Sequence, residues 1–181
     1  SVLVSVLICF VIGVPLGVIA SYNKWYRDIQ NVVLDAMQTL PYFCYLIPVL
    51  MFFGGNIVSA VIATVIYSVP PIIRLTALGL SQVSGSYSEV SKSFGGTGIQ
   101  TLNKVKFPLA VPSLVMGFNQ TVIMAFAMQI VTPLIGGKGL GLQVFNALQR
   151  SDTGRGLSAG LAIVLLAIIT VSYTHLTLPT S

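Results

Sequence analysis

Four long runs without a single charged residue constrain the fold of this chain more than any other feature. They cover residues 1–23, 36–73, 107–137 and 156–174. A helix needs roughly 20 apolar residues to cross a bilayer. The whole chain is 55% hydrophobic and only 7% charged, with a mean hydropathy of +0.92, whereas soluble domains carry about 25% charged residues. These runs therefore predict an all-α integral membrane protein.

The second run is too long for one span, and Gly54-Gly55-Asn56 offers a short turn at which it divides. The sequence therefore predicts about five transmembrane helices, over residues 2–20, 32–53, 57–80, 111–135 and 157–173. Residues 1–171 are expected to form one transmembrane domain that is incomplete at its N-terminus, because the chain starts inside a span. Residues 172–181 change character abruptly and include the one histidine, so we expect a non-native tail there.

Positive charges are distributed unequally between the two sides of this expected topology. Six lie on the side of the first and third loops, at Lys24, Arg27, Arg74, Lys92, Lys104 and Lys106. Three lie on the other side, at Lys138, Arg150 and Arg155. The positive-inside rule makes the first side cytoplasmic. The net charge of +5 does not indicate nucleic acid, because the basic residues flank spans and form no stripe with interleaved aromatic residues.

The long polar loop before the fourth span has the pattern of two short helices. Ser86 or Ser88 can cap the first helix, which would place Glu89 in its first turn, where a carboxylate is favourable. Gly95-Gly96 would end that helix, and a second short helix is expected over residues 98–105. An ordinary capped loop between spans is the alternative interpretation.

The spacing within this loop resembles the E-A-A-x3-G-x9-I-x-L-P signature of permease subunits in ATP-binding-cassette importers. The signature positions are occupied by Glu89, Val90, Ser91, Gly95, Val105, Phe107 and Pro108. Glutamate, glycine and proline match, whereas the two alanines, the isoleucine and the leucine are replaced. The resemblance implies that this loop docks on an ATPase subunit and couples its nucleotide cycle to transport. It also implies a type I importer permease core with a cytoplasmic coupling-helix loop.

Further stretches resemble the glycine betaine/proline class of these permeases, the importers of quaternary amines. The matching stretches are residues 34–41, 45–48, 60–67, 70–76, 119–121, 136–141, 154–156 and 159–164. The resemblance implies a multi-pass permease subunit of the bacterial plasma (inner) membrane that imports glycine betaine or proline betaine-like osmoprotectants. The implied partners are an ATPase that binds ATP and Mg²⁺, a substrate-binding protein and a second permease subunit, as a homodimer. The alternative is a secondary transporter of small zwitterions driven by an ion gradient.

Several residues of the expected spans are candidates for lining a translocation pathway. Asp35 is an acid at membrane depth, which is often functional, although it could instead satisfy backbone donors near the start of its span. Pro41 and Pro48 interrupt the hydrogen bonding of the second span and predict a kink, either at a pathway or for packing alone. One face of the fourth span presents Met116, Gln120, Met124 and Met128. This soft face suits either a pathway or core packing.

The chain offers no recognisable site for catalysis or for a nucleotide. Gly136-Gly137-Lys138-Gly139 lacks the first glycine and the final Ser or Thr of a phosphate-binding loop. We therefore expect a transport subunit that is not itself an enzyme, without a cofactor or metal of its own, in a complex that acts as an ATP-driven translocase. Glycine betaine, proline betaine, carnitine and choline all remain open as substrates.

Overall fold

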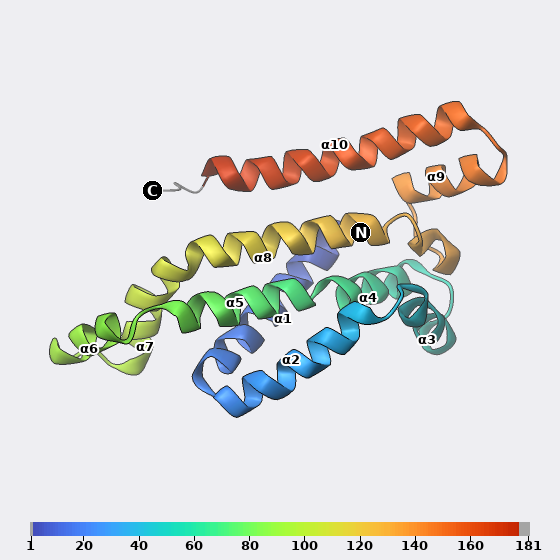
Figure 1. Ribbon diagram of the computed structural model, residues 1–181. Helices are drawn as coiled ribbons and strands as arrows, with labels where there is room; N and C mark the ends of the chain where they lie inside the picture. Colours follow the sequence, from blue (N-terminus) through green and yellow to red (C-terminus); the bar gives the residue numbers. More distant parts are fainter. Residues whose placement is uncertain (1, 178–181) are drawn as a thin grey trace.

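A computed structural model describes residues 2–177, with side chains through Ser172, and within this range the chain is helical without strands (Figure 1). The elements are α1 Val2–Tyr22, α2 Lys24–Thr39, α3 Phe43–Phe53, α4 Ile57–Ser68, α5 Pro70–Gln82, α6 Gly85–Ser93, α7 Gly98–Thr101, the π-helical η1 Leu102–Lys106, α8 Phe107–Met128, the 3₁₀ helix η2 Thr132–Ile135, α9 Leu140–Gln149 and α10 Thr153–Thr177. Four helical segments are long and apolar enough to cross a membrane, and the bent α2–α3 pair makes a fifth.

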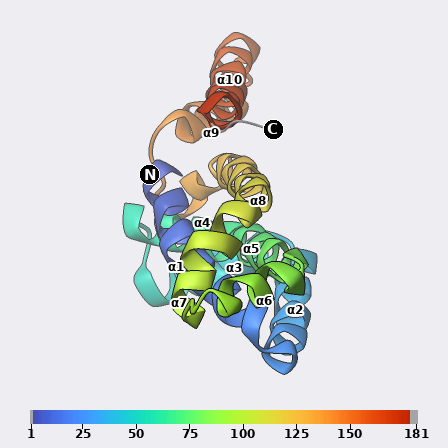
Figure 2. The ribbon, with the colours of Figure 1, turned by 90° about the vertical axis from the view of Figure 1, so that its left-hand side faces the viewer.

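Helix α5 lies at the centre of the bundle, between α1 and α8. Glycines allow these helices to approach closely: a Cβ on Gly17 of α1 would lie 2.6 Å from the Cβ of Thr76 and 2.7 Å from the carbonyl oxygen of Ile73. Gly117 of α8 packs similarly against Ile72 of α5. Small residues at helix crossings let the backbones approach closely. Such close packing matters in a bilayer, because the hydrophobic effect does not drive helices together there. Helices α9 and α10 lie along one side of this bundle (Figure 2), where Ile163 of α10 packs in a cluster with Val122 and Phe126 of α8.

The second predicted span is wrong as a single helix. The chain breaks between α2 and α3, and the two helices meet at an angle of 94°. Leu40 has extended dihedrals, φ −73° and ψ 132°, because the ring of Pro41 disfavours the helical conformation of the residue before it. Pro41 lies in the break and Pro48 lies inside α3. The proline therefore produces a sharp corner rather than the predicted kink.

The fourth predicted span extends too far at its end. Helix α8 stops at Met128, and residues up to 135 form a turn and the separate helix η2. Pro133 lacks the amide that a continuing helix needs, and Gly136, which has φ +88°, ends η2. The following helix α9 was not predicted at all. Helix α10 continues through Thr177, residues 178–181 lie outside the described range, and the non-native tail stays a prediction.

The two ends of the bundle hold the two groups of loops that the charge distribution predicted. At one end, the ammonium of Lys106 lies 5.4 Å from the ring centroid of Tyr22, so the start of α8 and the end of α1 meet there. At the other end, Gly136 lies against Asn56 at the start of α4. The first loop and the α6–α7 segment therefore lie on the same side, as expected.

Candidate functional site

The loop with the importer signature forms a compact projection at one end of the molecule (Figures 1 and 2). We call α6, α7 and the turn between them the α6–α7 knob, residues 85–101. Helix α6 ends in a paired hydrogen-bond motif in which the amide of Gly95 donates to the carbonyl of Lys92 and that of Gly96 donates to Ser91, both at 2.9 Å. Gly95 has φ +79°, which favours glycine. The predicted helix end at Gly95-Gly96 is confirmed.

The second helix of the knob starts with a reciprocal cap. The Thr97 hydroxyl accepts from the amide of Gln100, and the Gln100 side chain accepts from the amide of Thr97 at 2.9 Å. The Ser91 and Thr101 hydroxyls lie 2.8 Å apart and join the two helices. Hydrogen bonds therefore fix the turn at the end of α6 and at the start of α7, and one further hydrogen bond connects the two helices. The serine that replaces the second alanine of the signature makes this tie.

The predicted cap of the first knob helix is wrong by a few residues. Ser84, rather than Ser86 or Ser88, accepts from the amide of Ser86, and the helix begins at Gly85. Glu89 therefore lies in the second turn instead of the first, away from the unpaired amides of the helix start. Its side chain is exposed, so its role there depends on what approaches from outside.

The knob exposes four large apolar side chains. Phe94 is 88% exposed and Ile99 is 74% exposed, and Tyr87 and Val90 are also exposed. Contiguous exposed apolar side chains mark sites of protein contact. Glu89 and Lys92 of α6 are also exposed and add charge to the knob.

The second half of the signature lies at the root of the knob. Val105 belongs to the π-helical turn, in which the amide of Phe107 donates to the carbonyl of Leu102, and Pro108 occupies the first turn of α8. Segments α7, η1 and α8 together form one helical stretch of 31 residues. The signature therefore joins an exposed surface to a long transmembrane helix.

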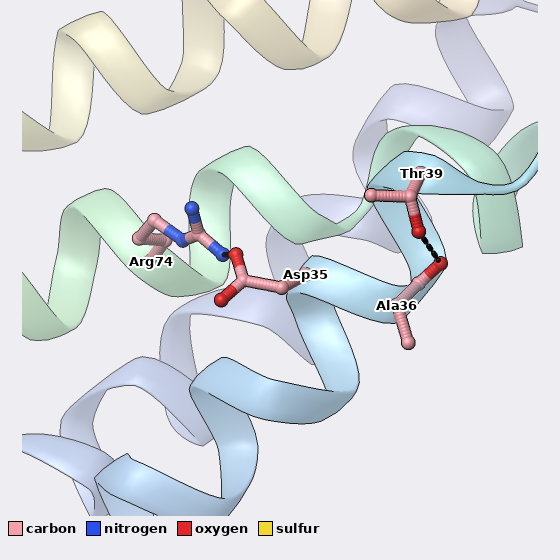
Figure 3. A network of polar contacts seen from close by, with 4 residues as sticks. All are labelled: Asp35, Ala36, Thr39 and Arg74. Atoms are coloured by element: carbon pink, nitrogen blue, oxygen red, sulfur yellow. Dashed lines mark hydrogen bonds and ion pairs between the residues drawn. The ribbon is translucent and has the colours of Figure 1, made fainter.

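Asp35 pairs with an arginine on a neighbouring helix. Arg74 of α5 donates to the Asp35 carboxylate of α2 at 2.5 Å (Figure 3). The Nε of Arg74 is buried and has no hydrogen-bond partner among the residues that the structure describes. Figure 3 also shows Thr39 donating to the carbonyl of Ala36 at 2.9 Å, one turn further along α2. The side chain of Asp35 thus connects α2 to α5 through an ion pair. In the alternative interpretation it would instead accept hydrogen bonds from backbone amides.

The four residues of the predicted soft face of α8 differ in how far they are buried. Met116 is 56% exposed, Gln120 is exposed and Met124 is half-buried. Met128 is only 1% exposed and packs in a cluster with Leu46 and Ala60, among others. The structure does not bring these residues together with Asp35, Pro41 and Pro48 into one channel of the described chain. Their assignment to a pathway stays a prediction.

Sequence reasoning missed several residues that build these sites. Thr97 and Gln100 have the spacing of a capping box, a local signal that was available. Arg74 is 39 residues from Asp35, and no local pattern links the two.

Residues 13–177 of this helical core match the binding-protein-dependent transport system inner membrane component family. The chain belongs to this family, and it is a protein of the bacterial inner membrane.

Three curated relatives cover most of this chain. It is 43% identical over 92% of its length to the glycine betaine transport system permease protein OpuAB of Bacillus subtilis. It is 46% identical over 93% to the glycine betaine/carnitine transport permease protein GbuB of Listeria monocytogenes and 44% over 93% to the glycine betaine/proline betaine transport system permease protein ProW of Escherichia coli. The chain spans 59%, 60% and 48% of these relatives, respectively.

Solved structures show the same fold. Two crystal forms of the inward-facing MetNI methionine ABC transporter align with TM-scores of 0.76 and 0.75 at 23% and 22% identity. Each alignment covers 97% of this chain and 87% of the other. The predicted type I importer permease fold is thereby confirmed.

Proposed function

We propose that this chain is the membrane-spanning permease subunit of an ATP-driven importer for glycine betaine or proline betaine-like osmoprotectants. The observation that carries the proposal is the α6–α7 knob: a fixed turn with an exposed apolar surface, in a chain of the binding-protein-dependent family. The names of the relatives support a quaternary-amine substrate.

In this proposal the knob docks on an ATPase subunit, which binds ATP and Mg²⁺ and hydrolyses the nucleotide. Phe94 and Ile99 supply apolar contact area, and Glu89 supplies a charge at its edge. The caps and the Ser91–Thr101 hydrogen bond hold the knob rigid. A movement of the ATPase subunit would therefore displace the whole knob instead of deforming it. The continuous helical stretch from α7 into α8 carries that displacement into the membrane, where α8 packs on α5.

The proposed complex contains further subunits. A substrate-binding protein would deliver the osmoprotectant to the outer face, and a second copy of the permease would complete the pathway as a homodimer. The family description, which includes dependence on a binding protein, supports the first of these partners. Glu89 and the knob of each copy would then meet one ATPase each. This chain itself would carry out no chemistry and hold no cofactor.

The rival function is a secondary transporter that uses an ion gradient. Such a protein has no ATPase subunit on which a rigid, exposed loop could dock. Membership of the binding-protein-dependent family therefore favours the ATP-driven function over this rival.

Reconstitution tests the proposal directly. The permease would be co-expressed with its partner ATPase and binding protein, purified and placed in liposomes containing ATP. Uptake of labelled glycine betaine should require all three proteins and ATP, and an ionophore that abolishes ion gradients should not stop it. Uptake by the permease alone, driven by an imposed ion gradient, would show that the rival is correct.

A further inference from the structure

A small cavity lies where the break between α2 and α3 meets α4 and the end of α8. Its volume is about 270 Å³. We call it the tyrosine pocket, and it is lined by Tyr42, Tyr67, Ala127, Met128, Ile130 and Val131. Met128 was already a candidate for the pathway, whereas neither tyrosine was.

The fold positions both aromatic rings. Pro41 ends the preceding helical segment, so Tyr42 lies in the corner and faces the pocket instead of continuing the face of α2. Tyr67 belongs to α4, and its ring meets the ring of Tyr45 edge-on, with centroids 6.0 Å apart at an interplanar angle of 67°. The hydroxyl of Tyr45 donates to the carbonyl of Met37, which fixes Tyr45 behind Tyr67. The corner at Pro41 therefore places an aromatic side chain, that of Tyr42, in the wall of the pocket.

The lining of the tyrosine pocket is selective in its chemistry. It contains two phenol rings, a thioether and aliphatic side chains, and none of its six residues is charged. Aromatic faces attract cations through the ring quadrupole, and quaternary ammonium groups are well suited to such sites. A quaternary ammonium has no N–H donors, so it needs no carboxylate or carbonyl oxygens around it. A primary ammonium or a hydrated metal ion would lose more hydrogen bonds there than the two phenol hydroxyls of this lining could replace.

We propose that the tyrosine pocket binds a quaternary ammonium group within the permease itself. The further step, that this cation is the trimethylammonium end of the transported molecule, rests on the proposed function. Tyr42 and Tyr67 supply the ring faces, Met128 supplies a polarizable contact, and Tyr45 is a positioning residue. Tyr42 remains partly exposed, which leaves the pocket open to an incoming ligand.

The test measures binding of tetramethylammonium to the permease–ATPase complex in lipid nanodiscs, without the binding protein, by calorimetry. Tyr42→Leu and Tyr67→Leu remove a ring, and we expect roughly 2- to 30-fold weaker binding from each, the range that cation–π attraction supports. Tyr42→Phe and Tyr67→Phe keep the ring face and should retain most of the affinity. Phe52→Leu is the matched control, since Phe52 lies on α3, is 84% exposed and is outside the pocket.

Each result decides the proposal. Loss in the two leucine variants with retention in the phenylalanine variants supports it. Unchanged binding in both leucine variants, an equal loss in Phe52→Leu, or no saturable binding by the unmodified complex overturns it. Uptake of glycine betaine by the complete system is measured in parallel: uptake without tetramethylammonium binding refutes the pocket and keeps the proposed function. Ring-dependent binding without uptake of any quaternary amine keeps the pocket and refutes the proposed function.

Discussion

Replacing Gly96 by alanine should open the turn of the α6–α7 knob. A Cβ at this position would lie 2.6 Å from the Oγ of Ser91 and 2.7 Å from its carbonyl oxygen. Because one of these atoms belongs to the backbone, no rotation of a side chain can relieve the contact. The turn must shift, and the shift separates the groups that now hold it.

The size of the effect follows from the hydrogen bonds that depend on this turn. The amide of Gly96 donates to the carbonyl of Ser91 at 2.9 Å, and the Ser91 and Thr101 hydroxyls lie 2.8 Å apart. At about 0.5–1.5 kcal/mol for each bond, their loss destabilises the closed turn by about 1–3 kcal/mol. The ratio of closed to open knob should therefore fall roughly 5- to 150-fold.

Two neighbouring glycines provide graded controls. Gly95→Ala meets nothing within 4 Å and is strained only through its φ of +79°, a cost of about 1 kcal/mol. Gly98→Ala also meets nothing within 4 Å and lies at the start of α7, where alanine is favourable. The expected order of damage is Gly96→Ala, then Gly95→Ala, with Gly98→Ala close to the unmodified protein.

The assay is the number of substrate molecules imported per ATP hydrolysed in proteoliposomes, together with affinity for the ATPase subunit. Insertion should be unaffected, because the spans lie elsewhere, and the amount of purified permease checks this. If Gly96→Ala retains both normal coupling and normal ATPase affinity, the fixed turn is not what transmits the nucleotide cycle.

Three further outcomes are expected. In a cysteine-free background, Ser86→Cys should react with an impermeant thiol reagent only from the cytoplasmic side and Gln149→Cys only from outside; labelling of the former in intact cells would contradict the topology. Neutralising either Asp35 or Arg74 should reduce transport severalfold by breaking the ion pair that joins α2 to α5, and exchanging the two residues should restore it; a double variant no better than the single ones would refute the pairing. Glu89→Lys should weaken ATPase binding severalfold while the permease still assembles, and unchanged affinity would remove Glu89 from the interface.

Local sequence was enough for most of the membrane architecture. Uncharged apolar runs have few alternatives to crossing a bilayer, so α1, the α4–α5 pair and α10 were predicted closely. The end of α6 was also predictable, because Gly95 adopts a conformation that other residues resist. The serine cap was misplaced, since Ser84, Ser86 and Ser88 are equivalent to a local argument.

The interruptions of the apolar runs were harder to predict. Composition shows that a segment belongs in the membrane, but it does not show where the helix must turn. Pro41 allows a kink or a corner, and the packing of α3 against α4 and η2 selects the corner. The same limitation placed the end of the fourth span beyond Met128 and concealed α9.

The sequence by itself determined a helical membrane protein and a signature loop, because each of these depends on residues close together in the chain. Only the tertiary structure decided that Asp35 meets Arg74, that Ser91 is tied to Thr101, and that Tyr42 and Tyr67 line one pocket. These contacts join segments whose separation along the chain carries no periodic signal. The Asp35–Arg74 pair and the tyrosine pocket exist because α2, α4, α5 and α8 pack at particular angles, and those angles arise from the whole set of helix contacts rather than from any one stretch of sequence. The Ser91–Thr101 hydrogen bond exists because the turn between α6 and α7 folds the two helices of the knob against each other.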